Sequence, residues 1–217
     1  MLFFKEHPRT FPDFFDQAPV IRVRDPLAQL LGSATDGIID YRYVDAVRLA
    51  GHSCPTVAGA FLTARAALKA LYPDRLPERG AIRVHMPSPE IEGTTGVVAQ
   101  VLTLITGAAA QCGFKGIGQR FARNGLLTFA SEHVEHNAGI RFERLDTGSA
   151  VLVHVDAHRI PADASQPERM QAVIHQRETP EEQAEFARLW QERVQRILLQ
   201  HADDPALLSI LELPPTQ

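Results

Sequence analysis

The sequence predicts an α+β fold, in which a mostly antiparallel sheet packs against two buried helices, with an N-terminal arm and a C-terminal helical extension. Two helical patterns, 55–72 and 94–111, are apolar enough to be buried. The predicted strands are grouped after the first of these helices, which is typical of α+β proteins and not of repeating β-α-β units. With 217 residues, of which 45% are hydrophobic, the chain can form one sizeable core.

Residues 1–40 are expected to form an arm over the body of the protein. Prolines interrupt this segment and phenylalanines give it apolar anchors: Pro8, Pro12, Pro19, Pro26, Phe11, Phe14 and Phe15. One short helix is predicted within it, because Asp25 suits the N-cap, Pro26 the first helical position and Gly32 the C-cap.

The predicted α+β core spans residues 41–160. Its pattern indicates helices over 41–49, 55–72 and 94–111, strands over 81–86 and 126–130, and a hairpin of 140–145 with 150–156. In the first of these strands Ile82, Val84 and Met86 should share one face, because side chains alternate along a strand.

The remaining segment, 161–217, is predicted to hold a polar linker over 161–170 and C-terminal helices. Thr179, Pro180 and an acidic first turn mark the start of a helix that continues to about Gln200. This helix carries an apolar stripe: Phe186, Leu189, Trp190, Val194, Ile197 and Leu198. The stripe must be buried, either against its own domain or against a second chain in a homodimer, and both alternatives are open at this point.

The composition argues against several classes of protein. The chain has 22 Lys and Arg against 26 Asp and Glu and no basic stripe, so nucleic-acid binding is not expected. No apolar run approaches the ~18 residues that span a bilayer, and the first residues lack a secretory pattern, so a cytoplasmic protein is expected. Two cysteines do not make a disulfide framework. Cys112 is expected to pack inertly at the end of a helix.

The strongest local motif is Gly51-His52-Ser53-Cys54-Pro55. Pro55 suits the first helical position and makes Cys54 the N-cap, where free N–H groups and the helix dipole stabilise a thiolate. Imidazole and thiolate together suit zinc, nickel, copper or iron. His52 and Cys54 are therefore candidate metal ligands, and Cys54 is also the candidate catalytic group. The alternative is a plain N-cap with a buried thiol and a hydrogen-bonded histidine.

The start of the second long helix offers further polar groups. Glu92 could ligate a metal or act as a general base, and Thr94 and Thr95 offer hydroxyls beside free N–H groups. The alternative is a capped helix whose glycines allow close packing.

Two loops complete the set of candidates. Lys115, in the glycine-rich loop 113–118, could place a positive charge over a site, although the loop lacks the spacing of a nucleotide-binding motif. The segment 132–136 contains two histidines and two glutamates, but it is interpreted as a solvated loop between strands.

In this order of elements, the chain resembles the FmdE-like family, named after the E-type subunit of formylmethanofuran dehydrogenase, over about 41–156. The resemblance rests first on the G-H-x-C-P element before an alanine-rich helix and on the strand that follows this helix. It continues with a second helix that carries the sequences AQVLT at 99–103 and ITG at 105–107. The loop at Lys115-Gly116 and the hairpin turn with the sequence DTG at 146–148 complete it. It implies a usually dimeric α+β core with His52 and Cys54 at a metal-binding active site. Family members place a reactive Cys-Pro at the second helix start, which implies that this start faces the first motif.

The chain departs from that family in two places. The second Cys-Pro is replaced by the region from Glu92 to Thr95, which favours an oxygen ligand, and 165–217 contains no cysteine, so the zinc finger of many relatives is missing. We therefore expect a homodimeric metal-binding protein, with zinc as its metal and a small-molecule ligand near Glu92, Thr94, Thr95 and Lys115. It is either an enzyme whose substrate the sequence does not name or a non-catalytic accessory or metal-handling subunit of a redox complex.

Overall fold

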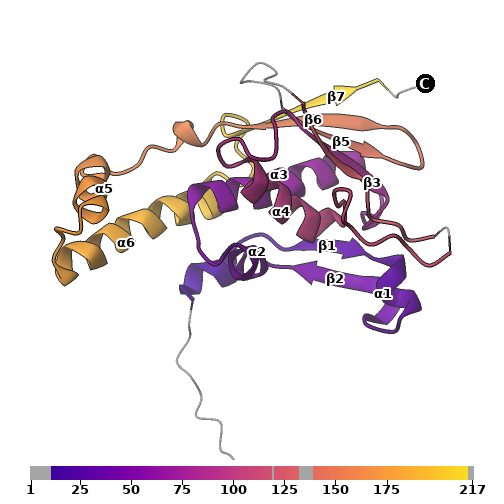
Figure 1. The fold of residues 1–217 in the computed structure, drawn as a ribbon, viewed down its shortest axis with the longest axis horizontal. Helices are drawn as coiled ribbons and strands as arrows, with labels where there is room; N and C mark the ends of the chain where they lie inside the picture. The colour runs from indigo at the N-terminus through magenta and orange to yellow at the C-terminus, as the bar shows by residue number, and fades with distance from the viewer. Residues whose placement is uncertain (1–10, 119, 132–138, 215–217) are drawn as a thin grey trace, which may run out of the picture.

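The computed structural model describes residues 11–118, 120–131 and 139–214. Its main elements are β1 (Ile21–Arg24), α1 (Pro26–Leu30), β2 (Ile38–Tyr41), α2 (Tyr43–Ala50), α3 (Pro55–Leu71), β3 (Ile82–Met86), α4 (Thr95–Thr106), β4 (Leu127–Phe129), β5 (Ile140–Arg144), β6 (Ala150–Val155), α5 (Gln166–Ile174), α6 (Pro180–Gln195) and β7 (Leu208–Leu213). Helices α3 and α4 lie between a five-stranded sheet and the two-stranded sheet of β1 and β2 (Figure 1).

The larger sheet confirms the predicted α+β class and its mostly antiparallel pairing. Its strand order is β4-β3-β5-β6-β7, and only the β3–β4 pair is parallel. Val84 of β3 lies opposite Leu127 on one side and Phe142 on the other, and all three are buried. The predicted alternation of β3 therefore sets the core face of the sheet.

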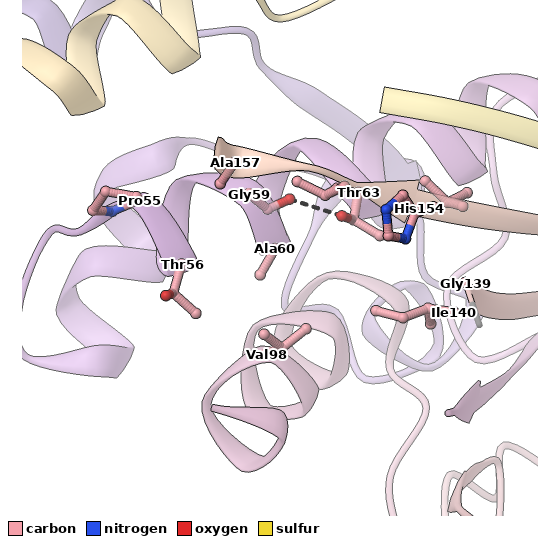
Figure 2. A pocket seen from close by; sticks show the side chains of 12 residues that line it. Pro55, Thr56, Gly59, Ala60, Thr63, Val98, Gly139, Ile140, His154 and Ala157 are labelled. Carbon is pink, nitrogen blue, oxygen red and sulfur yellow. Dashed lines mark hydrogen bonds between the residues drawn. The ribbon is translucent and has the colours of Figure 1, made fainter. Parts of the chain in front are cut away.

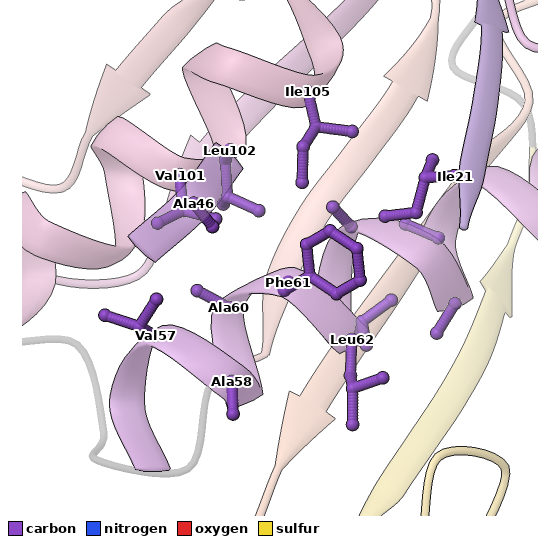
Figure 3. Close-up of a cluster of buried hydrophobic side chains, with 14 of the residues drawn as sticks. Ile21, Ala46, Val57, Ala58, Ala60, Phe61, Leu62, Val101, Leu102 and Ile105 are labelled. Carbon is purple, nitrogen blue, oxygen red and sulfur yellow. The ribbon is translucent and has the colours of Figure 1, made fainter. Parts of the chain in front are cut away.

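Helix α3 lies at the centre of the core. Pro55 occupies its first position and Cys54 its N-cap, as predicted, and the ring of Phe61 is fully buried halfway along. Phe61 meets Tyr43 of α2 edge-on, at a centroid distance of 5.8 Å. Figure 3 shows how side chains of β1, α2, α3 and α4 converge on this cluster. Because α3 is buried on nearly all sides, its first turn is held in place by packing.

Helix α4 is shorter than the sequence predicts. It ends at Thr106, because Gly107 adopts a left-handed conformation with φ of 75° and caps the helix. Cys112 therefore lies in a loop and is exposed, so the prediction that it packs at a helix end is wrong.

The segment predicted as an arm contains regular structure. Strands β1 and β2 pair antiparallel, and Ile21 and Val23 are buried in the core. The predicted helix at Asp25 is confirmed, since its carboxylate accepts hydrogen bonds from the backbone N–H groups of Leu27 and Ala28. The helix ends at Leu30, earlier than the sequence predicts.

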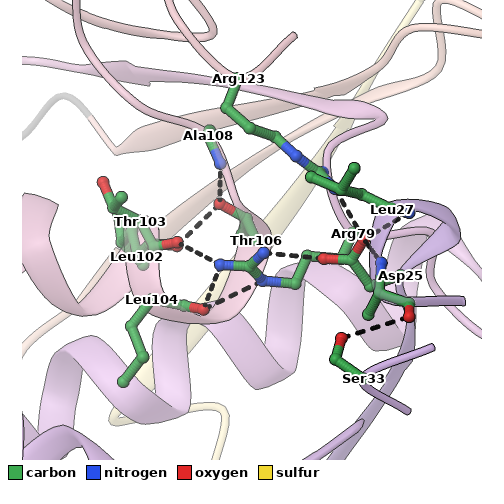
Figure 4. Close-up of polar contacts among 11 residues, drawn as sticks. Asp25, Leu27, Ser33, Arg79, Leu102, Thr103, Leu104, Thr106, Ala108 and Arg123 are labelled. Atoms are coloured by element: carbon green, nitrogen blue, oxygen red, sulfur yellow. Dashed lines mark hydrogen bonds and ion pairs between the residues drawn. The ribbon is translucent and has the colours of Figure 1, made fainter. Parts of the chain in front are cut away.

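A buried ion cluster joins three parts of this fold (Figure 4). The carboxylate of Asp25, only 3% exposed, accepts hydrogen bonds from Arg79 and Arg123, each at 2.8 Å. Arg79 also donates to the carbonyl of Leu104 near the end of α4. Burial alone would raise the pKa of Asp25, but the hydrogen bond from Arg79 and the charge of Arg123 hold it below its ordinary value. Gly80 is required beside Arg123, because a Cβ at that position would overlap the guanidinium.

The C-terminal segment differs from the prediction in two elements. The supposed linker 161–170 already contains the start of α5, and the predicted helices are followed by β7, which pairs with β6 at the sheet edge. The start of α6 is as predicted: the Thr179 hydroxyl accepts from the N–H of Glu182, and the Glu182 carboxylate accepts from the N–H of Thr179.

The apolar stripe of α6 is buried in its own chain at its C-terminal half. Val194, Ile197 and Leu198 are fully buried, in and beside the π-helical turn Arg196–Gln200 that ends the helix. Phe186 and Trp190 are half-buried, with their rings stacked at 5.6 Å. The homodimer stays a prediction, since the buried half of the stripe is accounted for within one chain.

Candidate functional site

The motif at residues 51–55 forms the turn between α2 and α3. Gly51 ends α2 with φ of 75°, a conformation that glycine adopts without strain. His52 then turns back, and its exposed ring lies with Nδ1 at 2.9 Å from the carbonyl oxygen of Ala50. A carbonyl only accepts, so this bond places the ring proton on Nδ1 and leaves the lone pair on Nε2.

Ser53, the middle residue of the motif, is held from two directions. Its hydroxyl lies 2.9 Å from the hydroxyl of Tyr43, and its carbonyl accepts hydrogen bonds from Trp190 Nε1 and Gln191 Nε2, both at 3.1 Å. Burial raises the pKa of Tyr43 well above its ordinary value, so the phenol stays protonated. Helices α2 and α6 therefore fix the backbone between His52 and Cys54.

Cys54 is the residue that joins the motif to the core. It is 8% exposed and extended, and its sulfur lies 3.4 Å from the N–H of Val57 in the first turn of α3. The sulfur thus accepts a hydrogen bond at a helix N-terminus, where a negative charge is favoured.

The thiolate-stabilising position of Cys54 and its burial have opposite effects on how fast its thiol reacts compared with that of Cys112. The position of Cys54 at a helix start favours reaction there, but in the structure Cys112 is exposed and Cys54 is buried. We expect iodoacetamide to alkylate Cys112 first in the folded protein and both thiols at similar rates in the unfolded chain. Mass spectrometry of a labelling time course checks this, and faster labelling of Cys54 in the folded state would contradict its burial.

A pocket of about 250 Å³ opens along the first half of α3 (Figure 2). Its walls come from α3, from Val98 of α4 and from the facing ends of β5 and β6. Thr56, Thr63 and His154 are the polar residues among those that line it, while neither His52 nor Cys54 does. Pro55, the last residue of the motif and the first of α3, lines the pocket, so the motif and the pocket adjoin at the start of this helix.

The other sequence candidates lie at the start of α4 and in the loop after its end. Thr94 is the N-cap of α4, without a side-chain cap bond, and Thr95 begins the helix, whereas the residue that α4 contributes to the pocket is Val98. Glu92 is half-buried just before the helix. Lys115 is exposed in the loop that follows the C-terminal end of α4, whereas Thr94 stands at the N-terminal end of this helix, which is about 18 Å long.

The motif holds two candidate metal ligands, His52 and Cys54. Nowhere in residues 11–118, 120–131 and 139–214 do three His, Cys, Asp or Glu side chains gather as a set that could hold a metal ion. The two histidines of 132–136 lie outside the described residues. In the same described ranges, no helix is both long and apolar enough to span a bilayer.

Three side chains that hold Ser53 were not predicted from the sequence. Tyr43 stands only ten positions away, but Trp190 and Gln191 are separated from Ser53 by 137 and 138 positions. The apolar stripe predicted that Trp190 is buried, while nothing in the pattern indicates what its indole N–H contacts.

Comparison with known proteins adds a resemblance and no family assignment. No model of a protein family matches the chain, and no curated protein matches it. Among solved structures, the chain is similar to a tungsten formylmethanofuran dehydrogenase FmdE-like protein from Syntrophus aciditrophicus, with a TM-score of 0.42 and 16% identity. The match covers 81% of this chain and 74% of that one. At this identity, the likeness gives no residue of this chain a role.

Proposed function

We propose that the protein binds one transition metal ion through Nε2 of His52 and the sulfur of Cys54, with zinc as the expected metal. The observation that carries this proposal is the bond between His52 Nδ1 and the carbonyl of Ala50. Histidines that ligate metals usually donate their other ring N–H to a carbonyl, carboxylate or water, because this bond orients the ring and raises its basicity.

The cysteine supports the same proposal. A thiolate is the ligand form of cysteine, and the first turn of α3 supplies an N–H donor to the sulfur. Nitrogen and sulfur ligands suit zinc, and two protein ligands leave coordination positions for water, a small molecule or a second chain. Both cysteines are free thiols, which fits the reducing cytoplasm that we propose as its compartment.

The bound metal would supply Lewis acidity and activation of a water molecule. The chain's own residues would orient the ligands. Tyr43, Trp190 and Gln191 hold Ser53, so the backbone that carries both ligands does not have to be ordered when the ion binds.

Metal content tests the proposal. We expect about one zinc per chain in wild type, and loss of most of it in His52→Ala, in Cys54→Ser and in the double variant, because each removes a ligand. Cys112→Ser and His158→Ala are matched controls on exposed residues and should keep the metal. Elemental analysis of purified proteins with matching circular dichroism spectra measures this. An unchanged metal content in the double variant would reject the site.

A non-catalytic accessory role is the second candidate. The observation that favours it is that α5 and the N-terminal half of α6 extend away from the two sheets, with Ile174 of α5 at 59% exposure (Figure 1). Co-purification of the tagged protein with a larger redox complex would favour this role, whereas turnover of a small carbonyl or one-carbon substrate would favour an enzyme.

A further inference from the structure

Strand β7 is the last strand on its side of the larger sheet among the described residues (Figure 1). It pairs with β6 at consecutive positions without a bulge, and Leu208–Leu213 contains neither lysine nor proline. Ile210 is 45% exposed and Leu211 is 60% exposed. Natural sheets usually protect an exposed edge with a bulge, a lysine or a proline, because an open edge binds further strands. The edge at β7 has none of these three devices and is suited to pairing.

The hydrogen-bond pattern shows which backbone groups this edge presents. The N–H of Asp156 donates to the carbonyl of Leu207 at 2.9 Å, and bonded and non-bonded pairs alternate along an antiparallel ladder. The odd-numbered residues of β7 therefore direct their backbone groups to β6, and the even-numbered ones, Leu208, Ile210 and Glu212, direct theirs outward. The N–H of Leu208 already donates within the chain, whereas in the described part of the chain those of Ile210 and Glu212 have no partner.

A groove of about 340 Å³ lies beside β7 on the face of the sheet that packs against α3. Three alanines line it, together with Lys69, Asp203, Leu208 and Ile210. The Asp203 carboxylate is bound by Arg65 at 2.9 Å, and the Lys69 ammonium lies further from it, at 3.5 Å, on a side chain that is 70% exposed. The groove therefore offers an apolar floor and an accessible positive charge. Every second side chain of an added strand would point into it.

Strand β7 itself carries the side chains that fit this groove. Two copies can pair antiparallel about a two-fold axis that passes Ile210 or Leu211. The partner's Glu212 then lies opposite Leu208 or Ile210, which line the groove, and its carboxylate meets the charge of Lys69. The same axis brings an exposed apolar side chain, Ile210 or Leu211, against its own copy. An axis at Glu212 would instead place two carboxylates opposite each other, which is unfavourable.

We propose that β7 pairs with β7 of a second copy of this chain, so that the two larger sheets join into one continuous sheet. Backbone hydrogen bonds supply affinity, and the pair of Lys69 with the partner's Glu212 selects a second copy over strands without an acidic residue there. This interface is independent of the proposed metal site. The double variant His52→Ala/Cys54→Ser should therefore dimerise as wild type does, and a monomeric double variant would contradict that independence.

Sedimentation velocity of the full chain tests the proposal, with a reducing agent present because Cys112 is exposed. One sheet edge is a small interface, so we expect a dimer that dissociates in the range of about 1–100 μM. A chain that stays monomeric at several times the upper end of this range would overturn the proposal.

Variants at the edge locate the interface. Leu211→Lys should weaken the dimer at least about 10-fold, because a lysine protects an edge from pairing. Ile174→Lys, on a residue of matched exposure on α5, should leave it unchanged. Ile210→Pro removes an outward N–H and keeps the bonds to β6, so it should weaken the dimer similarly and gives the same test if Leu211→Lys does not fold. Unchanged dimerisation in a folded edge variant would reject the interface.

A charge exchange tests whether the partner strand is β7. Glu212→Lys and Lys69→Glu should each weaken the dimer about 5-fold, because each turns two attractive pairs of the dimer into repulsive ones. The variant that carries both changes should recover most of the wild-type affinity. Absence of recovery in the folded double variant would contradict the pairing of β7 with its own copy.

Discussion

Asp25→Ala is expected to lower the free energy of unfolding by about 3–5 kcal/mol, the usual cost of removing one partner from a buried ion pair. The carboxylate is nearly inaccessible and is the acceptor for both Arg79 and Arg123, so the variant leaves two guanidinium groups without their anion. It also removes the cap of α1. Asp25→Asn keeps a cap oxygen and separates the two contributions. Urea denaturation measures the effect.

The control is Asp40→Ala, which breaks an exposed pair with Arg22 on the nearby β1–β2 sheet. Surface pairs contribute about 0–1 kcal/mol, so this variant should be close to wild type. Similar destabilisation in the two variants would mean that the cluster at Asp25 does not hold the fold together.

The same cluster predicts acid sensitivity with a defined sign. Because the folded-state pKa of Asp25 is held below its ordinary value, its ionised form contributes stability above the unfolded-state pKa of about 3.9. That contribution is lost as the pH falls from there through the folded-state pKa. Asp25→Asn should lack this component, so its stability should fall less steeply than that of wild type below about pH 4. Equal slopes would contradict the prediction.

Ile197→Ala and Leu198→Ala are each expected to cost about 2–5 kcal/mol, since both side chains are fully buried at the end of α6. The exposed Ile174→Ala on α5 is the matched control and should change stability by less than about 0.5 kcal/mol. If the stripe instead formed a dimer interface, the loss would depend on protein concentration. A loss that is the same at all concentrations supports burial within one chain.

Helix starts were predictable from the sequence, because the signals that fix them are local. Asp25, Cys54 and Thr179 each precede a proline at the first helical position, and all three are N-caps in the structure. The β3 face and the β5–β6 hairpin followed from alternation and a short turn.

Elements that depend on distant partners were not predictable in the same way. Strand β7 pairs with β6 across more than fifty positions, and β1 with β2 across a helix, so neither has a short turn to reveal it. The hydrogen bonds from α6 to Ser53 have the same cause. The motif at His52 and Cys54 could be found from spacing, whereas the pocket along α3 could not, because its walls come from helices and strands that are far apart in the sequence.

The bond between the Cys54 sulfur and a metal ion is the central claim, and the absorption spectrum of cobalt-substituted protein tests it most directly. Cobalt takes the same ligands as zinc, and a thiolate bound to it gives a sulfur-to-metal charge-transfer band in the near ultraviolet. We predict this band in wild type and in Cys112→Ser, and its loss in Cys54→Ser. An equally strong band in Cys54→Ser, or cobalt bound to wild type without the band, would contradict the assignment.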